Sequence, residues 1–325
     1  MGLLPVERSS FSQVCFQTVG LDFFGPLFVK HICSETSCPH QVQSSKVYGC
    51  IFTCFTSRAI HLELVVNLTT ATFLLAFRRF MSRRGIPQTC YSDNAKTFKG
   101  ADKELRRIFK TINWDHAQES MSRFKITFEF STANAPWTNG ITERMVGLTK
   151  KVLRIALHAT TLTTRELETV LFECEAIVNN RPLASVTEGD LLLPVTPAQL
   201  CVGRDLLHLP DPGRIKGQEE PQFVAKWRQR MMLVNSFWRR WRNDYLMCLA
   251  PTKKWTKKDE SPLSIGDVVL LRDDHLGRNE WKMARVENLH RGRDNLIRSA
   301  DLRLPSRSIV RRHINRLALL EENMS

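Results

Sequence analysis

The chain has 325 residues, of which 42% are hydrophobic and 25% are charged, so it can bury a core and is not disordered throughout. Its formal net charge of +14 at pH 7 favours a polyanion as partner, although a basic surface can also serve solubility alone. No apolar run approaches the roughly 18 residues that span a bilayer, and the N-terminus carries charges where a secretory signal has its apolar core. The nine scattered cysteines fit a reducing intracellular compartment.

The positive charge is concentrated toward the C-terminus. Residues 222–325 contain 22 Lys and Arg against 12 Asp and Glu, a net of +10. The first 221 residues contain 25 against 21, a net of only +4. We therefore expect the C-terminal third to supply most of the electrostatic attraction for a polyanion.

The first half of the chain predicts helices packed on a mixed sheet. Strand patterns at 16–25, 47–56 and 59–65 predict an antiparallel meander. Residues 69–85 follow with apolar residues at helical spacing, a capping Thr69 and a terminating Gly85. Farther along, the pattern predicts strands at 87–93 and 124–130 and helices at 100–112, 141–159 and 164–180. The order is typical of an α/β fold.

The last third predicts a different architecture. Residues 203–221 are rich in Pro, Gly and charge and indicate a linker. Residues 222–246 predict an amphipathic helix in which Trp227, Trp238 and Trp241 have the spacing of core residues, so packing is favoured over base stacking. Short strands that indicate a small β-barrel are predicted at 266–273, 283–289, 296–304 and 308–314. The expected domains are 1–205, a linker with helix at 206–250, and 251–325.

Three acidic residues stand where carboxylates are unexpected. Asp22 interrupts an apolar strand, Asp93 ends a strand, and Glu143 opens a helix. A carboxylate in such a strand is costly unless it is paired, hydrogen-bonded or bound to metal. Carboxylates are hard ligands suited to Mg²⁺ or Mn²⁺, and two such ions can serve phosphoryl transfer. Taken singly, Asp93 could close a turn and Glu143 could face the helix dipole, whereas Asp22 is harder to explain structurally.

At this point the sequence resembles the integrases of BEL/Pao-type long-terminal-repeat retrotransposons, within the retroviral integrase superfamily. The motifs that carry the resemblance follow one another in the expected order over almost the whole chain. They are VGLDFFGPL (19–27), IFTCFTSRAIHLELV (51–65), AFRRFMSRRGIPQTCYSDNAKTF (76–98), APWTNGITERMV (135–146), NNRPL (179–183), TPAQLCVGR (196–204), WRRWRNDYL (238–246) and GDVVLLRDD (266–274).

The resemblance implies an RNase H-like catalytic core in which Asp22, Asp93 and Glu143 hold two Mg²⁺ or Mn²⁺ ions. It implies DNA 3′-end processing and strand transfer, with no covalent enzyme intermediate. It further implies a C-terminal Src-homology-3-like barrel, double-stranded DNA as partner, a homo-oligomer, no membrane, and a nuclear location with cytoplasmic transit. The residues expected to contact DNA are Asn94, Lys150, Arg154, Arg239, Arg240, Arg242, Lys253, Lys254, Lys257 and Lys258. For Lys150 and Arg154, a solvated basic face is the alternative.

The sequence also departs from the family pattern. Ala95 replaces a glycine after Asp93 and Asn94, which matters if that backbone needs a positive φ. The loop before Glu143 is closer to gypsy-type elements, and it still ends in Gly140 and Glu143. The family carries a His-His-Cys-Cys zinc module before the core, and this chain begins at the MGLLPVER segment that follows it, so we expect the module to be absent.

A separate group, His31, Cys33, Cys38 and His40, has a spacing that could hold zinc, but an exposed loop is favoured because the spacing matches no familiar zinc-finger pattern. Three functions remain open from sequence. The first is an active integrase. The second is a domesticated or relic DNA-binding protein without strand transfer, favoured by Ala95 and the missing module. The third, a plain RNase H nuclease, is disfavoured by the long basic C-terminal region.

Overall fold

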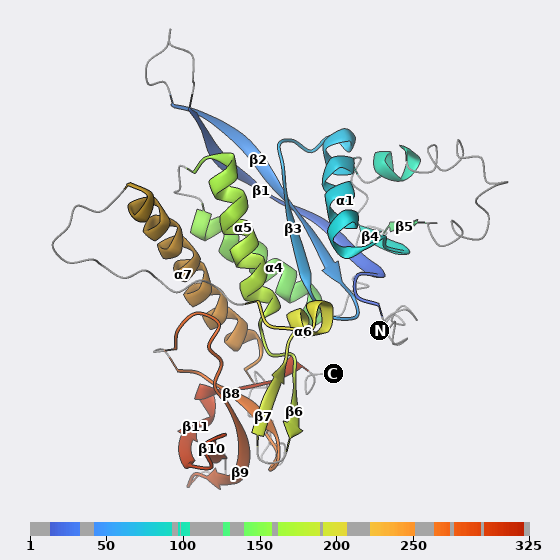
Figure 1. The fold of residues 1–325 in the computed structure, drawn as a ribbon. Coiled ribbons are helices and arrows are strands. Elements are labelled where there is room, and N and C mark those ends of the chain that lie inside the picture. The colour runs from blue at the N-terminus through green and yellow to red at the C-terminus, as the bar shows by residue number, and fades with distance from the viewer. Residues whose placement is uncertain are drawn as a thin grey trace. The chain divides into compact units, whose positions relative to one another are not determined.

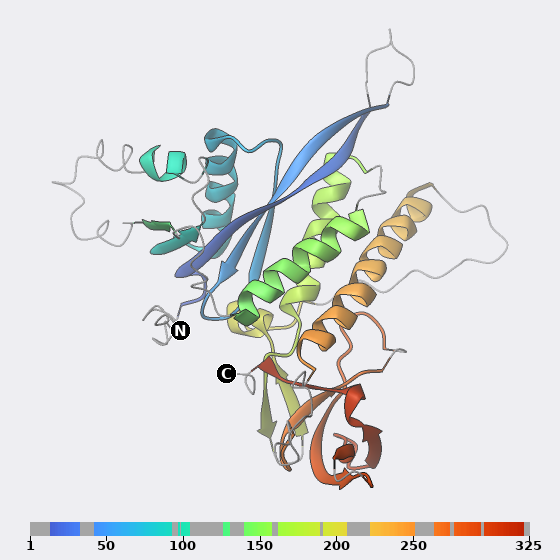
Figure 2. The ribbon, with the colours of Figure 1, turned by 180° about the vertical axis from the view of Figure 1, so that it is seen from behind.

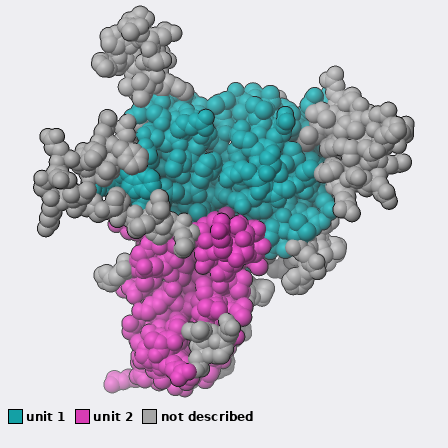
Figure 3. Space-filling model, viewed as in Figure 1, with its two compact units in different colours: residues 1–178, 207–237 teal, residues 179–206, 238–325 magenta. Residues whose placement is uncertain are grey.

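The structure is a computed structural model that describes residues 14–32, 42–92, 97, 99–104, 126–130, 140–157, 162–188, 191–206, 222–250, 263–273, 276–293 and 296–321. Its contacts divide the chain into two compact units (Figure 3). Unit 1 comprises residues 1–178 and 207–237, and unit 2 comprises residues 179–206 and 238–325. This is a grouping by contacts, and the domain boundaries expected at 205 and 250 stay predictions.

Unit 1 is built on a five-stranded mixed sheet with the order β3-β2-β1-β4-β5 (Figure 1). The first three strands are antiparallel neighbours, which confirms the predicted meander, while β4 and β5 run parallel to β1. Figure 2 shows β1 and β2 as a long two-stranded antiparallel pair. The strands are β1 (Thr18–Ile32), β2 (Val42–Cys54), β3 (Ile60–Val65), β4 (Thr89–Ser92) and β5 (Thr127–Phe130).

Helix α1 (Thr70–Arg84) has the ends that the sequence predicts. The Thr69 side chain accepts a hydrogen bond from the backbone N–H of Thr72, and Gly85 ends the helix with a φ of 91°. Its buried face carries apolar residues at helical spacing, and the ring of Phe80 stacks on Phe52 of β2 at 4.3 Å between centroids. Helix α1 therefore packs against the sheet at β2 and β3.

The other helices of unit 1 are α4 (Gly140–Leu157) and α5 (Thr164–Asn179), and the first part of α7 (Gln222–Cys248) belongs to the same unit. Helix α4 contacts β1. Residues 99–104 are helical, and the rest of the helix predicted at 100–112 lies outside the described residues. Arg230 of α7 donates to Glu166, the residue whose carboxylate caps the Thr163 N–H at the start of α5.

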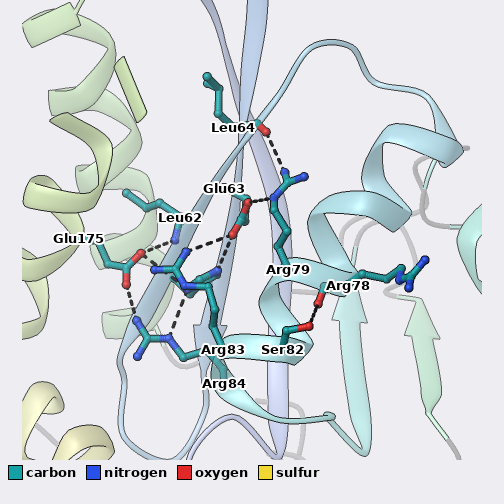
Figure 4. A network of polar contacts seen from close by, with 10 residues as sticks. Leu62, Glu63, Leu64, Arg78, Arg79, Ser82, Arg83, Arg84 and Glu175 are labelled. Carbon is teal, nitrogen blue, oxygen red and sulfur yellow. Dashed lines mark hydrogen bonds and ion pairs between the residues drawn. The ribbon is translucent and has the colours of Figure 1, made fainter. Parts of the chain in front are cut away.

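Strand β3 is an edge of the sheet, and a carboxylate covers part of that edge (Figure 4). The backbone N–H of Leu62 donates to Glu175 Oε2 on α5 at 2.8 Å. Arg84 of α1 donates to the other oxygen of Glu175. Because an exposed strand edge invites pairing with another chain, this contact also protects the sheet.

Beside it, Glu63 of β3 is buried and faces His61 and two arginines of α1. His61 Nε2 lies 3.1 Å from Glu63 Oε1, and Arg79 Nε donates to Glu63 Oε2 at 2.6 Å. Arg83 completes the set at 3.3 Å. Burial acts to raise the pKa of Glu63, but the hydrogen bonds from His61 and Arg79 outweigh burial, so the pKa is lowered. Glu63 is therefore ionised at neutral pH.

Replacing Glu63 by glutamine should lower the free energy of unfolding at pH 7 by about 1–3 kcal/mol, because charged hydrogen bonds are lost. The folded pKa is depressed, so the contribution of Glu63 is present above the unfolded pKa of about 4.3 and is lost as pH falls through the folded value. Urea unfolding of both proteins from pH 7 to pH 3 should show the gap closing. Glu168→Gln, which breaks an exposed pair with Arg165, is the matched control. A gap that stays constant with pH would contradict the prediction.

Unit 2 contains a separate five-stranded antiparallel sheet with the order β11-β10-β9-β8-β12. Its buried side is apolar, with Val269, Val286 and Leu302 among the core residues. The strands are β8 (Val268–Leu271), β9 (Met283–Arg291), β10 (Ile297–Arg303), β11 (Ile309–His313) and β12 (Leu317–Leu319), and a 3₁₀ helix, η4 (Ile314–Arg316), precedes the last. The four predicted strands are present, and β12 is an addition to them.

Three more elements of unit 2 lie where the sequence predicted no helix or strand. They are the hairpin strands β6 (Ala184–Glu188) and β7 (Leu191–Val195) and the short helix α6 (Pro197–Val202). Helix α6 is fully capped, since Thr196 and Gln199 form a reciprocal capping box and Gly203 ends the helix in the left-handed region.

A buried ion pair in unit 2 joins Arg181, just after α5, to Glu321, just after β12. Arg181 Nε donates to Glu321 Oε1 at 2.9 Å, and the two side chains are only 2% and 0% exposed. The hydroxyl of Tyr245 lies 3.0 Å from the same oxygen and 3.1 Å from the Pro182 carbonyl oxygen. Arg181 of the NNRPL motif is therefore a buried charge whose carboxylate partner lies within the same unit.

Candidate active site

Asp22 lies near the start of β1, the central strand of the unit 1 sheet. Because side chains alternate along a strand, the buried Leu21 points to the core and Asp22 points to the other face. The Asp22 side chain is 50% exposed, and its Oδ1 accepts the backbone N–H of Phe23 at 2.7 Å. Asp22 is thus an accessible carboxylate on the rigid centre of a sheet.

The neighbouring strand β4 runs parallel to β1 and ends at Ser92, which pairs with Leu21. Leu21 and Ser92 are the residues that directly precede Asp22 and Asp93 in the sequence. Asp93, Asn94 and Ala95 lie outside the described residues.

Helix α4 carries Glu143 and Lys150. The side chain of Glu143 is outside the described part of the chain, but position 143 lies seven residues, or about two turns, before Lys150 and so shares its helix face. Lys150 Nζ donates to Asp22 Oδ2, and the Lys150 side chain is 21% exposed. The contact shows that α4 meets Asp22 at Lys150.

Two buried thiols, Cys50 and Cys90, lie on the strands that flank β1. Burial raises the pKa of the Cys50 thiol well above its usual value, and the negative charges of Asp22 and Glu63 raise it further. Burial likewise raises the pKa of the Cys90 thiol. Both thiols therefore stay neutral, and neither is an activated nucleophile.

The other predicted site residues are dispersed. Arg154 is exposed on α4, and Arg239 and Arg240 are exposed on α7. Arg242 differs, because it is buried, its guanidinium donates to the Asp273 carbonyl oxygen, and its Cζ lies 5.8 Å from the Trp238 ring centroid. Lys253, Lys254, Lys257 and Lys258 lie outside the described residues, as do Cys33, Cys38 and His40. These assignments stay predictions.

Of the three tryptophans predicted to pack in α7, Trp238 and Trp241 do so, whereas Trp227 is only partly buried. Trp238 and Trp241 are buried, and both rings meet the Trp281 ring edge-on. Their indoles are thus occupied in the core of unit 2, as expected from their spacing. No stacking surface for bases follows from them.

The unit 2 sheet carries exposed arginines that were not singled out from sequence. Those exposed on or beside β10 and β11 are Arg298, Arg303, Arg307, Arg311 and Arg312. The charge of Arg311 is partly neutralised by its ion pair with Asp301. Hydrogen bonds from Arg311 and His290 lower the pKa of the Asp301 carboxyl to about 2. The signal that could have found this surface is the density of arginine in the predicted strands.

Within the described ranges, no group of three or more His, Cys, Asp or Glu residues is placed to hold a metal ion. Of the three expected metal ligands, only Asp22 has a described side chain. Among the helices that the structure describes, none is both long and apolar enough to cross a membrane.

Residues 225–320 match the sequence model of a family described as a family of unknown function (DUF5641). No curated protein matches the chain.

Among solved structures, the HTLV-2 integrase catalytic core domain in complex with magnesium is similar at 15% identity and a TM-score of 0.35, over 57% of this chain and 97% of that chain. A chain of the simian T-cell lymphotropic virus intasome in complex with PP2A regulatory subunit B56 gamma is similar at 10% identity and a TM-score of 0.36, over 96% and 81%. The BIV integrase catalytic core is similar at 13% identity and a TM-score of 0.34, over 58% and 95%.

Proposed function

We propose that this chain is an integrase of the BEL/Pao retrotransposon type that processes DNA 3′ ends and joins them to target DNA. The observation that carries the proposal is the setting of Asp22 at the centre of a mixed sheet, with the Lys150 face of α4 against it. The sheet order β3-β2-β1-β4-β5, with three antiparallel and then two parallel strands, is the order expected of an RNase H-like core.

We propose Asp22, Asp93 and Glu143 as the ligands of two Mg²⁺ or Mn²⁺ ions. Asp22 suits a cation, because its half-exposed carboxylate already faces one, the ammonium of Lys150. Ser92 pairs with Leu21. These are the residues directly before Asp93 and Asp22 in the sequence, which supports assigning Asp93 to the same site as Asp22 in this proposal. When bound, such a pair of ions stabilises the attacking and leaving oxygens of an in-line phosphoryl displacement.

The chain's own residues would position DNA. On this proposal Lys150 and Arg154 contact phosphate near the carboxylates. Arg239, Arg240 and the exposed arginines of β10 and β11 hold the backbone without reading sequence. The neutral, buried thiols of Cys50 and Cys90 fit a reaction in which the protein forms no covalent intermediate.

For unit 2 we propose a Src-homology-3-like barrel. Its support is topological: η4 lies between β11 and β12, so the chain passes from one edge strand of the sheet to the other through a 3₁₀ turn. We further propose that the protein acts as a homo-oligomer, since two DNA ends must be joined together, and that it reaches the nucleus after cytoplasmic transit.

The test is strand transfer by the full chain, with a labelled duplex oligonucleotide and a plasmid target in Mn²⁺ or Mg²⁺. We expect labelled plasmid to form with wild type and not with Asp93→Asn. Metal-dependent cutting without joining would indicate a plain nuclease. DNA binding by folded protein without metal-dependent joining would contradict the proposal in favour of a relic DNA-binding protein.

A further inference from the structure

The contact between Lys150 and Asp22 brings together two residues that the proposed function assigns to different partners. Lys150 Nζ donates to Asp22 Oδ2, whereas the proposal gives Asp22 a metal ion and Lys150 a DNA phosphate. The Asp22 carboxylate cannot offer Oδ2 fully to a metal while an ammonium occupies it. One contact must be exchanged for the other.

We propose that Lys150 is an internal counter-ion of the metal site, which a divalent ion displaces and thereby frees for DNA. Metal binding and DNA binding are then coupled through this one side chain, each favouring the other. The inference rests on the proposed function, because it takes Asp22 as a metal ligand.

The two oxygens of Asp22 are held in different ways. Oδ1 accepts the N–H of the adjacent residue Phe23 at 2.7 Å, a bond within the strand that fixes the orientation of the carboxylate. Oδ2 is held by Lys150, at the end of a flexible four-carbon stem. Among the described residues these two are the polar contacts of Asp22. The exchangeable contact is therefore the ammonium.

A permanent structural role for the pair is the competing explanation. Helix α4 is already held by its buried residues Leu148, Val152 and Leu153. The pair itself is partly open to solvent, at 21% and 50% exposure, and exposed ion pairs stabilise proteins little. The fold therefore does not depend on Lys150 staying in place, and the side chain is free to exchange partners.

The displacement of Lys150 by a metal ion is tested by Mn²⁺ binding in the absence of DNA, measured by electron paramagnetic resonance of free Mn²⁺. We expect Lys150→Met to bind Mn²⁺ about three- to ten-fold more tightly than wild type, because the ion no longer displaces a cation. Lys150→Arg keeps the charge and should stay near wild type. Lys151→Met removes a charge from the next, exposed position of α4 and should change the affinity less than two-fold.

The release of Lys150 to DNA is tested by DNA binding in Ca²⁺ and in EDTA. Unfolding temperatures confirm that each variant is folded. In Ca²⁺, the slope of log affinity against log salt should be steeper for wild type than for Lys150→Met by about 0.9, one phosphate contact. In EDTA the two slopes should agree, because Lys150 is then held by Asp22.

The outcomes distinguish a failure of the Lys150 exchange from a failure of the proposed function. Equal Mn²⁺ affinity of wild type and Lys150→Met, or a slope difference that is the same in EDTA and Ca²⁺, overturns the exchange and leaves the proposed function standing. Mn²⁺ affinity in wild type no greater than in Asp22→Asn overturns both, because Asp22 is then not a metal ligand.

Discussion

Replacing Asp22 by asparagine should lower the rate of metal-dependent DNA joining by about 10³-fold or more, roughly 4 kcal/mol of transition-state stabilisation. The amide keeps the size of the side chain and removes the charge that holds a divalent cation. Because Asp22 is half-exposed and its ion pair with Lys150 is partly solvated, the free energy of unfolding should change by less than about 1 kcal/mol. Activity and stability are therefore expected to separate in this variant.

The matched control is Glu129→Gln, which neutralises an exposed carboxylate on β5 of the same sheet. Its joining rate should stay within about two-fold of wild type, since it removes an acid without removing a proposed ligand. Single-turnover joining rates of both variants, measured beside their urea unfolding curves, are the test. An Asp22→Asn protein that is folded and joins DNA at the wild-type rate would refute the assignment.

Replacing Glu321 by alanine should destabilise unit 2 by about 3–5 kcal/mol, because it leaves the Arg181 guanidinium buried without its carboxylate. The Tyr245 hydroxyl loses the same oxygen. The loss should appear as an earlier unfolding transition of the residues in unit 2. It can be followed by the fluorescence of the buried Trp238 and Trp241 and of Trp281, which packs against both.

The control removes the same residue type from an ion pair at the surface. Glu287 pairs with Arg303, which is 54% exposed, so Glu287→Ala should cost no more than about 1 kcal/mol. If both variants lose equally little stability, the Arg181–Glu321 pair does not hold unit 2 together.

Sequence patterns predicted those helices and strands whose signals lie within a short stretch of residues. Helix α1 has its cap, its stop and its apolar stripe within 17 residues, from Thr69 to Gly85, and the structure reproduces all three. The meander of β1, β2 and β3 followed from alternation and succession. Strand β12 escaped prediction because three residues carry too little periodicity, and it exists through its pairing with β8. The hairpin β6–β7 carries Pro194, which argues against a strand.

The same difference between local signals and long-range contacts applies to the candidate site. Asp22 was singled out because a carboxylate in an apolar strand is a local anomaly, and the structure shows this carboxylate half-exposed and paired with Lys150. The contact with Lys150 could not be predicted, because it depends on how α4 packs on β1 across 128 positions of sequence. Burial separates Arg242 from Arg239 and Arg240 for a similar reason: a run of arginines gives no sign of which member lies beneath a tryptophan ring.

The central claim is that Asp22, Asp93 and Glu143 together hold a pair of divalent metal ions. Anomalous diffraction from crystals of the full chain soaked in Mn²⁺ tests it most directly. We predict manganese density at ligand distance, roughly 2 Å, from Asp22 Oδ2, with Asp93 and Glu143 oxygens on the same pair of ions and Lys150 turned away. Manganese bound elsewhere, with Lys150 still on Asp22 at saturating metal, would contradict the account.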